Sequence, residues 1–176
     1  MERIKESIFI KRPIDEVFRF LKAVEPRLRL NPSYELRSFS VLTEGPIAKG
    51  TCFRITFQTA TGISEYESEL VELRENELIK TRDTRGRLYL TLSVKPVSGG
   101  TLLTHDEEFV IPGDVLFDEH KTGFDWRNIF SHILHLDRVR FIDHEREEKI
   151  NCIKNDLKAK LQQWLRRIKE VLEDDI

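Results

Sequence analysis

His105 and Glu107 are the residues of this chain whose types and spacing best suit acid–base chemistry. They lie in "GGTLLTHDEEFVI", residues 99–111, a stretch typical of a β-strand. Side chains two apart on a strand point to the same face, so the imidazole and the carboxylate can hydrogen-bond. The carboxylate would then fix the tautomer of the ring, and the pair could polarise a carbonyl group or move a proton. A purely structural hydrogen bond is the alternative.

The same strand has two faces that are apolar at both ends and ionisable in the centre. One face carries His105 and Glu107, together with Leu103 and Phe109. The other face carries Asp106 and Glu108, and burying it would enclose two unpaired carboxylates, which is costly.

Other chemistry-bearing motifs are weak, and we predict neither a metal nor a cofactor. "HILH" places two histidines three residues apart, but the spacing matches neither HExxH nor a closed four-ligand zinc pattern. The histidines in question are His120, His132, His135 and His144. Cys52 and Cys152 belong to no CxxC motif, so we expect two free thiols.

The elements that position the His105–Glu107 pair follow from the periodicity. Residues 4–10 alternate as a strand, and Pro13 begins a helical stretch. From residue 34 to residue 111 the period is two, in six segments joined by short turns, which predicts an antiparallel meander. Near the C-terminus, apolar residues recur at steps of three and four and predict one long amphipathic helix. They are Ile150, Ile153, Leu157, Leu161, Trp164, Ile168 and Leu172.

The dimensions of these elements do not match. Seven strands about 4.8 Å apart make a sheet about 30 Å wide, whereas a helix is only about 10 to 12 Å across. We therefore predict an α+β fold in which a curved seven-stranded antiparallel sheet wraps round the long C-terminal helix. The space beside the helix is either filled by side chains or left open for a ligand.

Three stretches resemble the START/polyketide-cyclase-like (SRPBCC) superfamily, which has the helix-grip fold. They are "IKRPIDEVFRFL", "LTEGPIAKGTCFRITF" and "VKPVSGGTLLTHDEEF". The resemblance covers residues 4–111 through these motifs and residues 150–172 through the helical pattern of apolar residues. It implies a cavity between sheet and helix that holds lipids, sterols, hormones, polyketides or quinones; some members are cyclases, dehydratases or aromatase subunits. The resemblance also implies that Leu103, His105, Glu107 and Phe109 point inward, because the second residue after "GGT-L" packs inward in the superfamily. The superfamily has no shared catalytic signature. Residues 112–149 depart from its compact members as an extra segment: a lid helix, an extension of the last helix or an oligomer contact.

We therefore expect binding of a small hydrophobic ligand that is lipid-, polyketide- or quinone-like. The residues expected at the ligand are Phe53, Phe57, Tyr66, Leu90, His105, Phe109, Leu157, Leu161 and Trp164. One alternative is a cyclase- or dehydratase-type enzyme that uses His105 and Glu107. Another is a protein-interaction or homodimerisation module, because the apolar stripe within residues 126–133 needs burial.

Composition limits the remaining classes. The chain has 176 residues, with 29 basic and 31 acidic side chains and a net charge of −2, which suits one domain over residues 1–176. A net charge this close to zero does not indicate binding to nucleic acid. The short, charged start resembles no secretory signal, and no apolar run is long enough to span a membrane. We expect a cytoplasmic protein.

Overall fold

The computed structural model describes residues 1–59, 62–110 and 146–174, and within these ranges it confirms the predicted α+β fold. The strands are β1 (Glu2–Ile10), β2 (Glu35–Val41), β3 (Cys52–Thr59), β4 (Gly62–Arg74), β5 (Leu78–Asp83), β6 (Leu88–Val97) and β7 (Gly100–Phe109). The helices are α1 (Ile14–Lys22), α2 (Val24–Arg29) and α5 (Arg146–Asp174).

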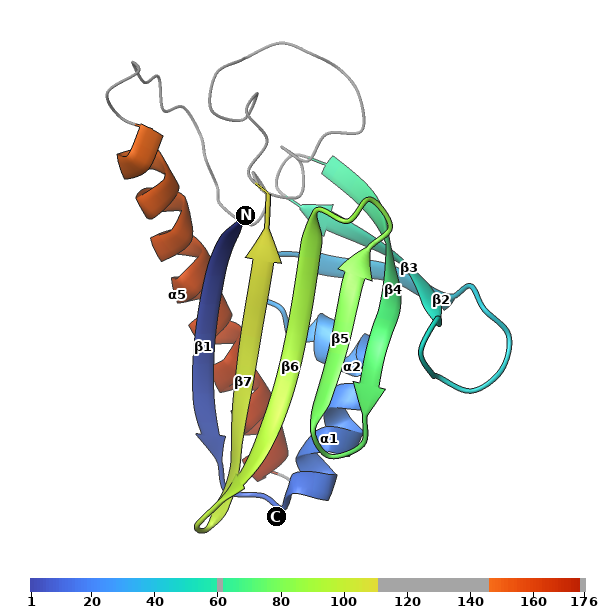
Figure 1. Ribbon diagram of the computed structural model, residues 1–176, viewed down its shortest axis with the longest axis vertical. Coiled ribbons are helices and arrows are strands. Elements are labelled where there is room, and N and C mark those ends of the chain that lie inside the picture. Colours follow the sequence, from blue (N-terminus) through green and yellow to red (C-terminus); the bar gives the residue numbers. More distant parts are fainter. Residues whose placement is uncertain (60–61, 111–145, 175–176) are drawn as a thin grey trace.

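All seven strands form one antiparallel sheet in the order β1-β7-β6-β5-β4-β3-β2. Strands β2 to β7 follow one another as the predicted meander, and β1 is added beside β7. Figure 1 shows β2 and β3 lying across the direction of β1 and β7, so the sheet is strongly curved. Register shifts in β2 and β4 (Leu36/Ser38 and Leu70/Glu72) mark irregularities of the kind that bend strands.

Helix α5 runs along β1 in the same direction. Three polar contacts join the two elements in order: Lys154 to Glu2 (2.9 Å), Gln162 to Glu6 (3.0 Å) and Lys169 to the Phe9 carbonyl (3.0 Å). Figure 1 shows α5 behind β1 and β7, while α1 and α2 lie behind β4 and β5. The long helix therefore covers one part of the sheet, and the two short helices cover another.

The inner face of α5 follows the predicted stripe. Its fully buried residues are Ile153, Leu157, Leu161, Trp164, Leu165 and Ile168. The predicted Ile150 and Leu172 are half-buried, and Leu165 was not predicted. Helix α5 begins at Arg146, four residues before the first residue of the predicted stripe, so it includes the end of the extra segment expected at 112–149. Glu147 and Glu148 are exposed in the first turn of α5, where the helix dipole favours acidic side chains.

The join between β1 and β7 depends on Gly100, at the start of β7. A Cβ atom added at this position would lie 2.2 Å from the carbonyl oxygen of Ile10, the last residue of β1. No side chain fits at that distance without movement of the backbone.

We expect Gly100→Ala to lower the free energy of unfolding by about 1 to 3 kcal/mol, because the added methyl group forces the two strands apart. Urea unfolding followed by circular dichroism measures this loss. Ser98→Ala, at an exposed position in the same turn, is the control and should leave stability within about 0.5 kcal/mol of the wild type. Equal stability of the Gly100→Ala variant and the wild type would contradict the close approach.

Candidate functional site

The centre of β7 presents the predicted pair to the interior. His105 is fully buried, and its Nε2 lies 2.8 Å from the Glu107 Oε1. Leu103 and Phe109, on either side of the pair along the strand, are also fully buried. A carboxylate can only accept this hydrogen bond, so Nε2 carries a proton and Glu107 fixes the tautomer of the ring.

The other ring nitrogen of His105, Nδ1, is buried and has no hydrogen-bond partner. The Trp164 ring of α5 packs edge-on against the imidazole, with 5.1 Å between ring centroids. Helix α5 therefore packs on the pair through an aromatic side chain, and nothing polar on that ring reaches Nδ1: the Trp164 Nε1–H donates to the Arg27 carbonyl at 3.0 Å.

Arg27 of α2 brings a cation to the same interior. Its side chain is buried, and its Nη1 donates to the Leu21 carbonyl at the end of α1 (2.8 Å). Its Nε has no partner. Burial lowers the pKa of Arg27 to about 10, so the guanidinium stays charged at neutral pH.

Two tyrosines complete what we call the inner polar cluster: Arg27, Tyr34, Tyr66, His105 and Glu107. Both tyrosines are half-buried, and desolvation raises the pKa of each hydroxyl above its ordinary value near 10. The charges of Arg27 and Glu107 act in opposite directions on both tyrosines: Arg27 lowers the pKa of each hydroxyl, and Glu107 raises it.

Aromatic rings surround the polar atoms of the cluster. The Phe57 ring lies between the two tyrosines, with centroid distances of 5.0 Å to Tyr34 and 6.4 Å to Tyr66. Such an arrangement offers flat apolar surface beside a few hydrogen-bonding groups, which is the usual make-up of a small-molecule site.

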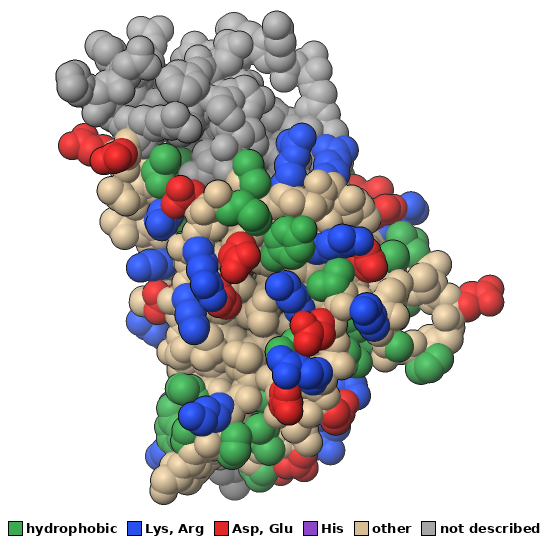
Figure 2. Space-filling view, viewed as in Figure 1, with side chains coloured by type: hydrophobic (Ala, Val, Ile, Leu, Met, Phe, Trp, Pro, Cys, Tyr) green, Lys and Arg blue, Asp and Glu red, His purple; other side chains and the backbone are tan. Residues whose placement is uncertain are grey.

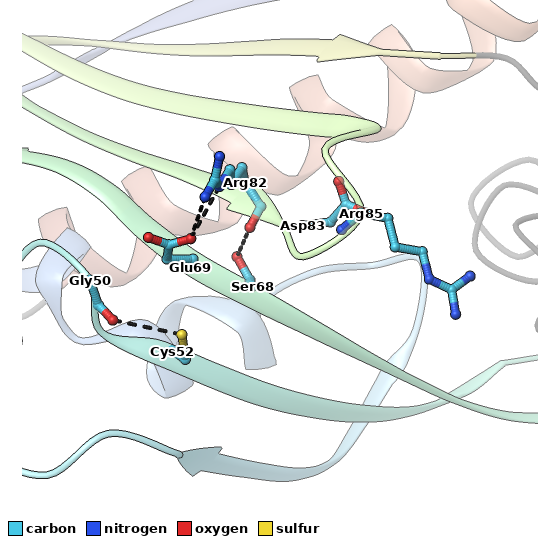
Figure 3. Close-up of polar contacts among 7 residues, drawn as sticks. All are labelled: Gly50, Cys52, Ser68, Glu69, Arg82, Asp83 and Arg85. Carbon is cyan, nitrogen blue, oxygen red and sulfur yellow. Dashed lines mark hydrogen bonds and ion pairs between the residues drawn. The ribbon is translucent and has the colours of Figure 1, made fainter.

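Two further buried polar residues near the cluster, Ser68 and Asp83, have structural partners. Ser68 of β4 donates to the Arg82 carbonyl (3.2 Å), while the Arg82 side chain pairs with Glu69 on the outer face, as Figure 3 shows. The carboxylate of Asp83 accepts the backbone N–H groups of Arg87 (2.6 Å) and Leu88 (2.7 Å), so it closes the β5–β6 turn.

All residues expected at the ligand lie on the inner side of the fold. Tyr66 and Leu90 are half-buried, and the others are buried: Phe53, Phe57, His105, Phe109, Leu157, Leu161 and Trp164. The prediction missed Arg27 and Tyr34. The stretch "RLRLN" offers no signal that its first arginine turns inward, and only the packing of α2 under the sheet determines it.

Several expectations fall outside the described residues. They concern residues 112–145 of the extra segment expected at 112–149 and the apolar stripe within residues 126–133. They also concern His120, His132, His135 and His144. Within the described ranges, no group of three or more His, Cys, Asp or Glu residues could hold a metal ion. Cys52 and Cys152 are both free thiols. None of the helices described here has the length and apolar character needed to cross a bilayer.

The outer face of the sheet carries charges of both signs. Figure 2 shows Lys and Arg side chains interspersed with Asp and Glu over this face. Ion pairs account for part of the pattern, as between Arg54 and Glu67 (2.7 Å) and between Arg3 and Asp106. An open cleft of about 330 Å³ between α1 and the β4–β5 turn is lined by polar and charged side chains, which suits an apolar ligand poorly.

Comparison with known proteins bears on the fold. No family model matches the sequence, and no curated protein matches it. Among solved structures, Ara h 8.0201 is 14% identical, with a TM-score of 0.61 and 99% of each chain covered. The Polyketide_cyc-like protein Cgl2372 from Corynebacterium glutamicum is 23% identical, with a TM-score of 0.50, 97% of this chain and 91% of that chain covered. The Aha1 dimer from Colwellia psychrerythraea is 14% identical, with a TM-score of 0.55, 98% of this chain and 97% of that chain covered.

These likenesses and the sheet that grips one long helix define the class of fold. The chain has the helix-grip fold that the resemblance in the sequence predicted, and it shares this fold with the three solved structures. Identities this low show the fold alone.

The raised pKa of Tyr34 has a measurable consequence. Its neutral form is stabilised in the folded state, so this stability is present below pH 10 and is lost as the pH rises further. We expect the unfolding free energy of the wild type to fall more steeply above pH 10 than that of Tyr34→Phe, by about 1.4 kcal/mol per pH unit. Urea unfolding at a series of alkaline pH values measures both slopes. Identical slopes would show that the hydroxyl is not desolvated.

Proposed function

We propose that this protein, which we expect to act in the cytoplasm, binds a small hydrophobic ligand between the curved sheet and α5. The observation that carries the proposal is the buried, unpartnered Nδ1 of His105. A buried polar atom without a hydrogen bond is costly, so proteins keep one chiefly where water or a ligand supplies the partner. With the proton on Nε2, Nδ1 is an acceptor, and a ligand hydroxyl group or a bridging water would satisfy it.

The surroundings of His105 support an apolar ligand. Phe57, Phe109 and Trp164 supply aromatic surface from β3, β7 and α5, and Leu157 and Leu161 add aliphatic surface from the helix. The few polar groups of the inner polar cluster would orient the ligand, as placed polar groups do in other apolar sites. The superfamily resemblance favours a lipid-, polyketide- or quinone-like molecule.

Native mass spectrometry of the purified protein tests the proposal directly. We expect a co-purified small molecule, seen as added mass on the intact protein and released on denaturation. A protein that carries no added mass and also fails to bind the neutral fluorophore N-phenyl-1-naphthylamine would overturn the proposal.

A larger side chain on the inner face of β6 tests where the ligand binds. Leu90 pairs with Glu107 across β6 and β7 and is half-buried on the inner face. We expect Leu90→Trp to weaken N-phenyl-1-naphthylamine binding at least tenfold, because the larger side chain occupies the space beside Glu107. The matched control is Ile63→Thr, which removes an apolar side chain that is 69% exposed. Loss of binding in the control instead would place the fluorophore on the surface.

A second candidate function is acid–base catalysis by His105 and Glu107, which the 2.8 Å hydrogen bond between them favours. Under this alternative, His105→Gln should retain the co-purified molecule and abolish its conversion, because catalysis needs the imidazole and retention does not. Chromatography with mass detection follows the conversion in the wild type and the variant. A molecule that the wild type leaves unchanged would exclude the catalytic alternative and leave the binding function intact.

A further inference from the structure

Arg27 is a buried cation whose charge is not matched by an acid. Its side chain is 4% exposed, and the one hydrogen bond of its guanidinium that the structure records goes to the Leu21 carbonyl. Leu21 lies in the last turn of α1, so the negative end of that helix offsets part of the charge. The Nε–H group remains buried and without a partner.

The acids near the cluster are engaged elsewhere. Glu107 accepts from His105, and Asp83 accepts from three backbone N–H groups of the β5–β6 turn. Among the described residues, no carboxylate lies within ion-pair distance of Arg27. A buried charge is normally paired, because the desolvation of an unpaired ion is unfavourable.

We infer that the ligand of the proposed site is an amphipathic organic acid whose anionic group pairs with the unsatisfied side of the Arg27 guanidinium. This inference rests on the proposed function and adds the chemical class of the ligand. A guanidinium presents several N–H donors in a fixed plane that matches a carboxylate or a similar oxyanion.

The neighbours of Arg27 suit the same ligand. Tyr34 and Tyr66 remain protonated at neutral pH because desolvation raises their pKa values, so their hydroxyl groups can act as donors to an oxyanion. The Phe57 ring between them and the Trp164 ring, whose indole N–H is bonded to the Arg27 carbonyl, supply the apolar surface for the rest of the molecule.

A neutral ligand, such as a quinone, would leave Arg27 unmatched, and the two classes are separable with a pair of fluorophores. N-phenyl-1-naphthylamine is neutral, and 1-anilinonaphthalene-8-sulfonate is the same ring system with an added sulfonate. We expect the sulfonate probe to bind the wild type at least tenfold more tightly at neutral pH. We also expect a weak salt dependence, because a buried ion pair is screened less than a surface pair.

The variant that tests the contact is Arg27→Gln, with Arg29→Gln as the matched control. Arg29 lies two residues further along α2, is exposed and pairs with Glu25 (2.5 Å). We expect Arg27→Gln to lose the preference for the sulfonate probe while it still binds the neutral probe, and Arg29→Gln to keep the preference. If Arg27→Gln does not fold, the ratio of the two affinities in the wild type and its salt dependence decide the question.

Competition by dodecanoate and methyl dodecanoate extends the test to a carboxylate. Displacement of the probe by the acid at concentrations at least tenfold below those of the ester supports the inference. Equal binding of the two fluorophores, or a preference that Arg27→Gln keeps, overturns the inference and leaves the proposed function standing. Failure of both fluorophores to bind overturns the proposed function itself.

Discussion

The packing of one helix against a sheet much wider than itself is the constraint on which the rest of this structure depends. Helix α5 runs along β1, tied to it by Lys154, Gln162 and Lys169. The remaining width of the sheet has to bend and to be covered by something other than α5. The short helices α1 and α2 lie behind β4 and β5, and Arg27 and Trp164 join α2 to α5 by one hydrogen bond.

That arrangement explains why polar side chains gather inside the fold. The inner faces of β4 and β7, together with α2 and the stretch before β2, contribute the inner polar cluster beside a core that is otherwise aliphatic and aromatic. Unmatched polar atoms such as the His105 Nδ1 and the Arg27 Nε lower the stability of the fold. The apolar core around them has to supply the compensating stability.

Much of the fold and three of the five residues of the inner polar cluster could be predicted from the sequence. The two-residue period of β7 put His105 and Glu107 on one face, and the resemblance together with the cost of burying two carboxylates selected that face as the inner one. The three-and-four spacing of α5 placed Leu157, Leu161 and Trp164 on the inner side. Arg27 and Tyr34 could not be predicted, because neither α2 nor the stretch before β2 has enough residues to set up a period. The orientation of Arg27 comes from a contact with α1, which directly precedes α2, and from one with α5, which is distant in the sequence. The orientation of Tyr34 comes from a contact with Phe57 of β3.

The pairing of β1 with β7 governs the order in which this molecule can assemble. Arg3 contacts Asp106 across 103 positions of the chain, and Glu2 reaches Lys154 across 152. Contacts between segments so far apart form slowly, because a long loop has to close at an entropic cost before the contacts contribute any stability. During synthesis on the ribosome, β1 leaves the ribosome before the rest of the sheet. It has no strand to pair with until β7, the last strand of the meander, has been made.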